Sequence, residues 1–293
     1  MKQGDASQGA RKYTLRMILS FGSSGETWVV ALPGLLALAA YVTAAALPQR
    51  AGTSVRASLV TAWLLHALAI GMDASGIGTN VSGARFGFAP ALSVTLWLVI
   101  AVYLIESRWL PLTGVRRALS VLGAVAVLLA LLFPGDLHPQ LVSRWVPLHW
   151  VLGIASYGLF GAAVLHAAML NRADKQMRRL PQLGAATASS NVGLPLLRLE
   201  RLTFRFVGAG FVVLSGAIVL GWWFARPWHW DHKAVLSLMG WAVFAGLLIG
   251  RRAFGWRGPR AAGWLYAGAG LLLLAYVGSR FVFEVVLHRT PTL

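Results

Sequence analysis

Tryptophan and histidine supply most of the side chains that could do chemistry in this chain of 293 residues, with 13 and 7 copies. The densest group lies in the segment GWWFARPWHWDHKAVLSLMGW, residues 221–241. That segment holds Trp222, Trp223, Trp228, Trp230, Asp231 and Lys233. Indole rings offer a large rigid face, and the indole N–H can donate to a polar edge. The pattern predicts a platform for a planar apolar ligand; the alternative is an aromatic belt at a membrane surface.

Three histidines are candidate metal ligands, because a neutral imidazole nitrogen coordinates metal ions readily. His149 and His288 stand at the ends of apolar segments, although His149 could instead cap a helix. His66 stands inside an apolar segment, about 15 Å from its basic end at the 1.5 Å rise of a helix. An ionisable side chain at membrane depth is a functional candidate, and the alternative for His66 is an interhelical hydrogen bond. No role is predicted for His166, and His138 is expected at the surface.

Several kinds of chemistry are excluded by what the sequence lacks. With no cysteine, the chain forms no disulfide, thiolate metal site or thiol nucleophile. The nine acidic residues stand mostly at the ends of apolar segments, whereas a proton or ion path needs carboxylates inside them. The sequence has no HExxH motif, no Gly-x-Ser-x-Gly motif and no glycine loop for phosphate. We therefore expect a binding protein, not an enzyme.

The elements that position these residues must be transmembrane helices. Hydrophobic residues make up 57% of the chain and charged residues 12%, about half of the ~25% charged share of soluble proteins. Eight apolar segments cover approximately residues 28–47, 56–72, 88–105, 118–133, 148–170, 203–224, 233–250 and 262–287. Within a bilayer each segment must satisfy its own backbone hydrogen bonds. The predicted fold class is therefore all-α, a polytopic membrane bundle of about eight helices.

The formal net charge of +17 gives the orientation of that bundle, because most basic residues lie between apolar segments. Sixteen of the 26 follow the first, third, fifth and seventh segments, which places those loops in the cytoplasm. Both termini are then periplasmic, and the tryptophan segment faces outward. Basic residues that are distributed between apolar segments do not indicate nucleic-acid binding.

The domain organisation is simple. Residues 1–27 are read as a polar tail, with Met17 as an alternative start, and residues 28–289 as one transmembrane domain. The polar segment 171–200 is interpreted as a cytoplasmic linker between a five-helix half and a three-helix half.

The motifs resemble those of a known family. The segment ending WHWDHK is similar to the WWD signature of the cytochrome c assembly (CcsA-like) membrane proteins, which handle haem. HWVLGIASYGLF, LLHALAI and the last ninety residues resemble its smaller YpjD/CorE-like inner-membrane branch. The resemblance implies a bacterial inner-membrane protein that holds haem at the outward tryptophan loop, between His149 and His288 as axial ligands. Lys233, Arg226, Arg144 or Arg85 would then pair with the haem propionates.

The chain also departs from the haem-transferring members of that family. Its tryptophan loop is shorter, and His232 and Ala234 replace the usual proline and glutamate. Ile249 stands where those members carry a second intramembrane histidine. These departures leave a second function open, a non-enzymatic accessory or regulatory membrane subunit, linked to transport or tetrapyrroles, that does not transfer haem. The expected partners are the lipid bilayer, haem and other membrane subunits.

Overall fold

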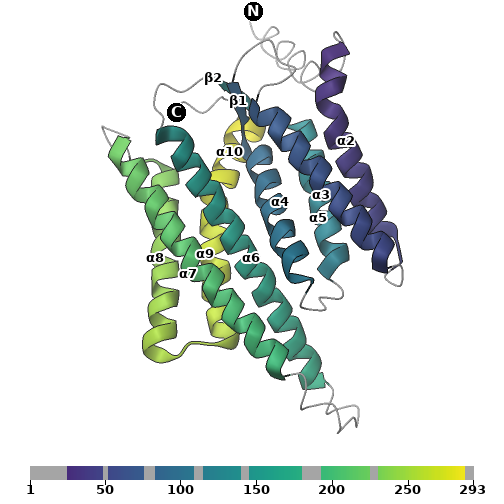
Figure 1. Ribbon diagram of the computed structural model, residues 1–293. Helices are drawn as coiled ribbons and strands as arrows, with labels where there is room; N and C mark the ends of the chain where they lie inside the picture. The colour runs from purple at the N-terminus through teal and green to yellow at the C-terminus, as the bar shows by residue number, and fades with distance from the viewer. Residues whose placement is uncertain are drawn as a thin grey trace, which may run out of the picture.

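Helices form nearly all of the computed structural model, which describes residues 25–48, 52–75, 83–108, 115–139, 145–179, 193–224 and 230–287 (Figure 1). The helices are α2 (Gly25–Ala46), α3 (Gly52–Ser75), α4 (Phe88–Glu106), α5 (Val115–Leu132), α6 (Trp145–Arg179), α7 (Gly193–Phe224), α8 (His232–Phe254) and α9 (Gly258–Leu273). The last one continues through the π-helical segment η2 (Leu274–Gly278), α10 (Ser279–Phe281) and the π-helical segment η3 (Val282–Val286). Each of the eight predicted apolar segments matches one of these helical stretches, and three of them, 28–47, 118–133 and 262–287, extend one residue beyond its end.

Length and composition of the helices fit a membrane. Among the described residues, seven helices are long and apolar enough to span a bilayer, and Val30–Ala46 of α2 is a shorter apolar stretch. Large apolar side chains cover the outside of the bundle, including Val212, Val219 and Val151, which are 69%, 63% and 61% exposed. Hydrocarbon is the solvent that suits such a surface. The prediction of a polytopic helical membrane bundle is confirmed, whereas the orientation remains a prediction.

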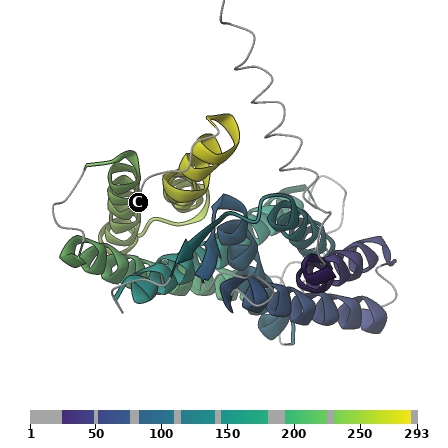
Figure 2. The ribbon, with the colours of Figure 1, turned by 90° about the horizontal axis from the view of Figure 1, so that it is seen from above.

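Two apolar cores divide the bundle into four and four helices. One core joins α2, α3, α4 and α5 around Tyr41, Leu59 and Ile100. The other joins α6, α7, α8 and α9 around stacked rings of Phe160 and Phe244, whose centroids are 3.8 Å apart. Seen from above, the two groups lie side by side (Figure 2). The predicted five-plus-three division is wrong, because α6 packs along α7 in the second core.

The predicted linker 171–200 is shorter than expected. Helix α6 has 35 residues and continues to Arg179, and α7 already begins at Gly193. At 1.5 Å per residue, α6 is about 52 Å long, well beyond the ~30 Å of hydrocarbon in a bilayer. The segment NRADKQMRR, residues 171–179, ends the apolar pattern but consists mainly of good helix formers, so the helix continues into water.

One feature of the fold is not helical. Strands β1 (Gly83–Phe86) and β2 (Asp136–Pro139) form an antiparallel ribbon, with Arg85 opposite Leu137 and Ala84 opposite His138. These strands were not predicted, because a strand of four residues is too short to show an alternating pattern. The ribbon joins the loop after α3 to the loop after α5.

Candidate site at the tryptophan end

Several candidate residues come together at one end of the second core. We call this the tryptophan end; it consists of the beginning of α6, the end of α7, the beginning of α8 and η3. Alternating helix directions bring these four points to the same end of the bundle, next to the β ribbon (Figure 1). The opposite end of the same helices contains the turn between α8 and α9, and we call it the arginine end.

His149 lies at the tryptophan end, in the first turns of α6, and packs against α7. Its Nδ1 lies 2.9 Å from the carbonyl oxygen of Ala217. A carbonyl oxygen only accepts, so Nδ1 carries the proton and Nε2 carries the lone pair of the neutral ring. Gly221 makes room for the ring, because a Cβ there would lie 2.9 Å from Cε1 of His149. A backbone bond that orients one ring nitrogen is typical of metal-binding histidines.

The described tryptophans of this segment, Trp222, Trp223 and Trp230, are largely exposed. Trp222 and Trp223 directly follow Gly221 and are 55% and 67% exposed. Trp230, at the start of the next helix, is 70% exposed. Exposed indoles fit either a ligand platform or an interfacial belt. Trp228 lies outside the described residues, as do Arg144, Arg226 and His288.

Asp231 has a local structural role. It is the N-cap of α8, and its carboxylate accepts a hydrogen bond of 2.8 Å from the backbone N–H of Ala234. Carboxylates at this position satisfy an otherwise unpaired amide and complement the helix dipole. The aspartate of the WWD-like motif therefore sets the direction in which α8 leaves the loop. Whether it also meets a ligand stays a prediction.

Lys233 and Arg280 bring positive charge to the same end. Lys233 is half-buried and interacts electrostatically with Arg280, Asp231 and His149. Arg280 is only 3% exposed, and its Nη1 lies 3.6 Å from Glu284 in the next turn. From the sequence, Arg280 was predicted only as one of the outward positive charges and not as a residue of this site. Its position inside an apolar segment could have indicated a functional role.

Two other predicted residues have different partners. Arg85 lies on β1 and interacts electrostatically with Asp73 of α3. His66 is 1% exposed, and its Nδ1 and Nε2 lie 3.2 Å from the Tyr41 hydroxyl and 2.7 Å from the Ser93 hydroxyl. The structure thus has the interhelical hydrogen bonds that formed the alternative for His66. Metal ligation by His66 stays a prediction, and it would displace one of these hydroxyls.

A buried ion pair was not predicted. His166 is fully buried, its Nδ1 donates to the carbonyl of Ala162, and its Nε2 lies 2.6 Å from Glu106. The pair joins α4 of the first core to α6 of the second. Sequence alone did not reveal it because 60 residues separate the partners. It lies near the arginine end, away from the tryptophans.

Within the described part of the chain, no three histidine or acidic side chains converge as a metal-ion site. The tryptophan end instead combines one histidine that is oriented by a backbone bond, exposed indoles and two cations, Lys233 and Arg280. A porphyrin supplies its own four nitrogen ligands, so a protein that binds one adds only axial ligands.

Comparison with known proteins identifies the relatives of this chain. The sequence profile of the cytochrome c assembly proteins matches residues 33–287. The inner membrane protein YpjD of Escherichia coli K12 is 29% identical over 266 residues, covering 86% of this chain and 98% of that protein. The cytochrome c biogenesis protein CcsA of Gloeobacter violaceus is 27% identical and covers 75% of this chain and 86% of its own length. CcsA of Guillardia theta is 25% identical, over 69% of this chain and 84% of its own length.

Proposed function

This chain belongs to the cytochrome c assembly protein family, and we propose that it binds haem at the tryptophan end as a multi-pass inner-membrane protein. The name of YpjD supports the inner-membrane location, and the CcsA relatives, named for cytochrome c biogenesis, support haem as the ligand. The predicted orientation would place the site on the periplasmic side.

The position of His149 is the observation that carries the proposal. The bond from its Nδ1 to Ala217 leaves the lone pair on Nε2, the nitrogen that would ligate iron. The ring lies against Gly221, directly before the exposed Trp222 and Trp223. An axial ligand is thus held beside an aromatic surface on which the porphyrin would rest. The second axial ligand in this proposal is His288, which follows the described end of the last helix at Leu287.

Lys233 and Arg280 would bind the carboxylates of the ligand. Both lie at the same end as His149 and interact electrostatically with one another. Ionised side chains form the strongest hydrogen bonds to carboxylates. Glu284 and Asp231 lie beside these cations and offset part of their charge, so the ligand carboxylates would compete with them.

The proposed role is binding and not bond formation. Iron, when bound, would supply redox and ligand-exchange chemistry, and the residues of this chain hold and orient it. His149 would ligate the iron, the tryptophans would contact the porphyrin, and Lys233 and Arg280 would bind the propionates. We therefore propose a non-enzymatic haem-binding protein.

The absorption spectrum of the detergent-purified full chain, made in haem-replete cells, tests this proposal. We expect a Soret band and the spectrum of low-spin, bis-histidine iron. His149→Ala should convert the bound haem to a high-spin form, and added imidazole should restore the low-spin spectrum by filling the cavity. A histidine that only packs against α7 would alter stability without altering the spin state.

His66→Gln is the matched control, because it removes a buried imidazole from the other core. Its spectrum should equal that of the unmodified protein. A low-spin spectrum that persists in both His149→Ala and His288→Ala would contradict the assignment of the axial pair.

A second candidate is an accessory or regulatory membrane subunit, linked to transport or tetrapyrroles, that uses this fold without haem transfer. Two observations favour it: His66 is engaged by two hydroxyls, and Ile249 is 61% exposed on the outside of α8. A colourless protein from haem-replete cells would support this candidate, with other membrane subunits as its partners.

A further inference from the structure

We propose that the arginine end of the second core binds an anionic phospholipid. One acyl chain would lie in the groove where α6, α7, α8 and α9 meet, and the phosphate would lie on the arginines of the α8–α9 turn. This site is separate from the tryptophan-end site and does not depend on haem binding.

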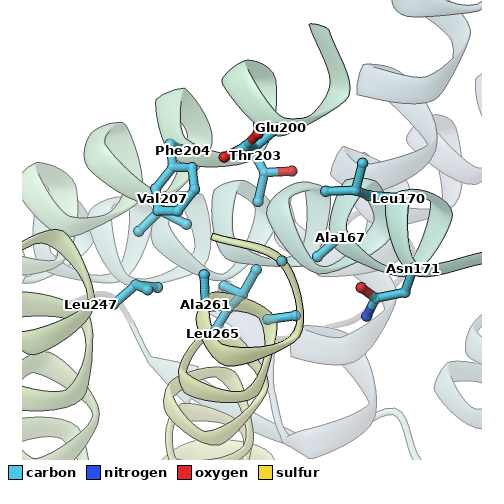
Figure 3. Close-up of a pocket in the computed structure, with 12 residues that line it drawn as sticks. Ala167, Leu170, Asn171, Glu200, Thr203, Phe204, Val207, Leu247, Ala261 and Leu265 are labelled. Carbon is cyan, nitrogen blue, oxygen red and sulfur yellow. The ribbon is translucent and has the colours of Figure 1, made fainter. Parts of the chain in front are cut away.

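The groove has apolar walls and a polar rim (Figure 3). Its walls include Phe204, Val207, Leu247, Ala261 and Leu265, and it is a shallow groove that is partly open to the surroundings. Such a narrow, open, apolar groove suits a flexible hydrocarbon chain better than a bulky rigid ligand.

Polar groups at the rim already have partners within the protein. Thr203 donates to the carbonyl of Leu199, and the amide of Asn171 donates to Tyr266 at 3.1 Å. Glu200 accepts from Arg251 at 2.6 Å. Because these groups are satisfied, the groove offers apolar contact and not a set of hydrogen bonds to a polar ligand.

Positive charge is in excess at the mouth of this groove. Arg251, Arg252, Arg257 and Arg260 lie in and beside the turn between α8 and α9. Glu200 is the acidic residue among those that line the groove, and it also lies 3.4 Å from Arg257, whose side chain is 65% exposed. One carboxylate cannot neutralise four guanidinium groups, so an anion would be attracted to the mouth.

Aromatic side chains place this turn at the depth of lipid headgroups. Trp256 and Trp264 pack with ring centroids 5.2 Å apart, and the guanidinium of Arg260 lies 4.2 Å above the Trp256 ring. Phe254 is 74% exposed beside them. Tryptophan prefers the interface between hydrocarbon and water, so the arginines lie where phosphates lie. Basic pockets between helices at this depth are suited to anionic headgroups.

Native mass spectrometry of the full chain in detergent, with added phosphatidylglycerol or phosphatidylethanolamine, tests the proposal. We expect phosphatidylglycerol to be retained and to raise the melting temperature, and phosphatidylethanolamine to do so far less. Arg257→Gln with Arg260→Gln should weaken phosphatidylglycerol binding by roughly 25-fold, from about fivefold per arginine at a membrane surface. Arg117→Gln removes an exposed arginine from the first core and should leave binding unchanged.

Two further experiments distinguish binding of a lipid from binding of a free anion. Leu170→Trp narrows the groove without changing charge, and it should weaken phosphatidylglycerol binding. Excess glycerol phosphate, which lacks acyl chains, should not displace the lipid. Equal retention of the two lipids, full binding by the double arginine variant, an equal loss in Arg117→Gln, or displacement by glycerol phosphate would each overturn the proposal. None of these results depends on whether haem is bound.

Discussion

At the scale of single residues, the motif of the tryptophan loop combines two kinds of role. Asp231 caps α8 through the amide of Ala234, which is a requirement of the helix. Trp222, Trp223 and Trp230 are largely exposed, as indoles at a membrane surface or beside a ligand would be. The aspartate thus has a role within its helix, whereas the indoles face the surroundings.

Replacing the cap separates these roles. Asp231→Ala should destabilise the protein by about 1 kcal/mol, because the amide of Ala234 loses its acceptor. Asp231→Asn keeps a capping oxygen and should retain most of that stability. Thermal unfolding in detergent measures the difference. If the asparagine variant keeps its stability but loses bound haem, the charge of Asp231 also acts on the ligand; if both variants unfold equally, capping is not the role.

At the scale of elements, contact between α6 and α7 positions the imidazole of the proposed site. The ring of His149 lies over Gly221, with Ala217 one turn earlier on the same helix face. A close approach of two helix backbones through a small residue is common in membrane bundles. Helix packing, and not the loop, therefore orients the ring of His149.

A methyl group on α7 tests this dependence. In Gly221→Ala the new Cβ would lie 2.9 Å from Cε1 of His149, so the ring must move. We expect weaker haem retention and a partial shift towards high spin, read from the absorption spectrum. Gly216→Ala is the matched control on α7, because its Cβ would meet Leu152 at an ordinary 3.8 Å. Equal spectra of the two variants would show that α7 does not position the histidine.

The sequence predicts elements well wherever hydropathy decides them. All eight apolar segments are helical, because a bilayer leaves few alternatives for the backbone. The prediction is wrong where hydropathy carries little information. The end of α6 at Arg179 depends on helix propensity, and each strand of the β ribbon has only four residues. His149 could be named as a candidate ligand from its position at the end of an apolar segment. Its hydrogen bond to Ala217, 68 residues away, could not be predicted, because it depends on tertiary packing.

At the scale of the whole molecule, the two ends of the bundle differ in charge. In the sequence, sixteen of the 26 basic residues follow the first, third, fifth and seventh apolar segments, whereas six stand on the predicted opposite side, namely Arg85, Arg144, Arg226, Lys233, Arg280 and Arg289. By the positive-inside rule, this asymmetry predicts the orientation in the membrane and therefore the compartment that the tryptophan site faces.

Reporter fusions measure that orientation. Alkaline phosphatase folds to an active enzyme only in the periplasm, so a fusion after Leu293 should be active. The same reporter inserted between residues 180 and 192 should be inactive, because that segment joins α6 to α7 at the arginine end. Deleting residues 2–16 removes four basic residues of the tail and should leave both results unchanged, since sixteen remain on the other side. An inactive fusion after Leu293, with an active one in the segment 180–192, would place the tryptophan end in the cytoplasm and remove the periplasmic haem site from consideration.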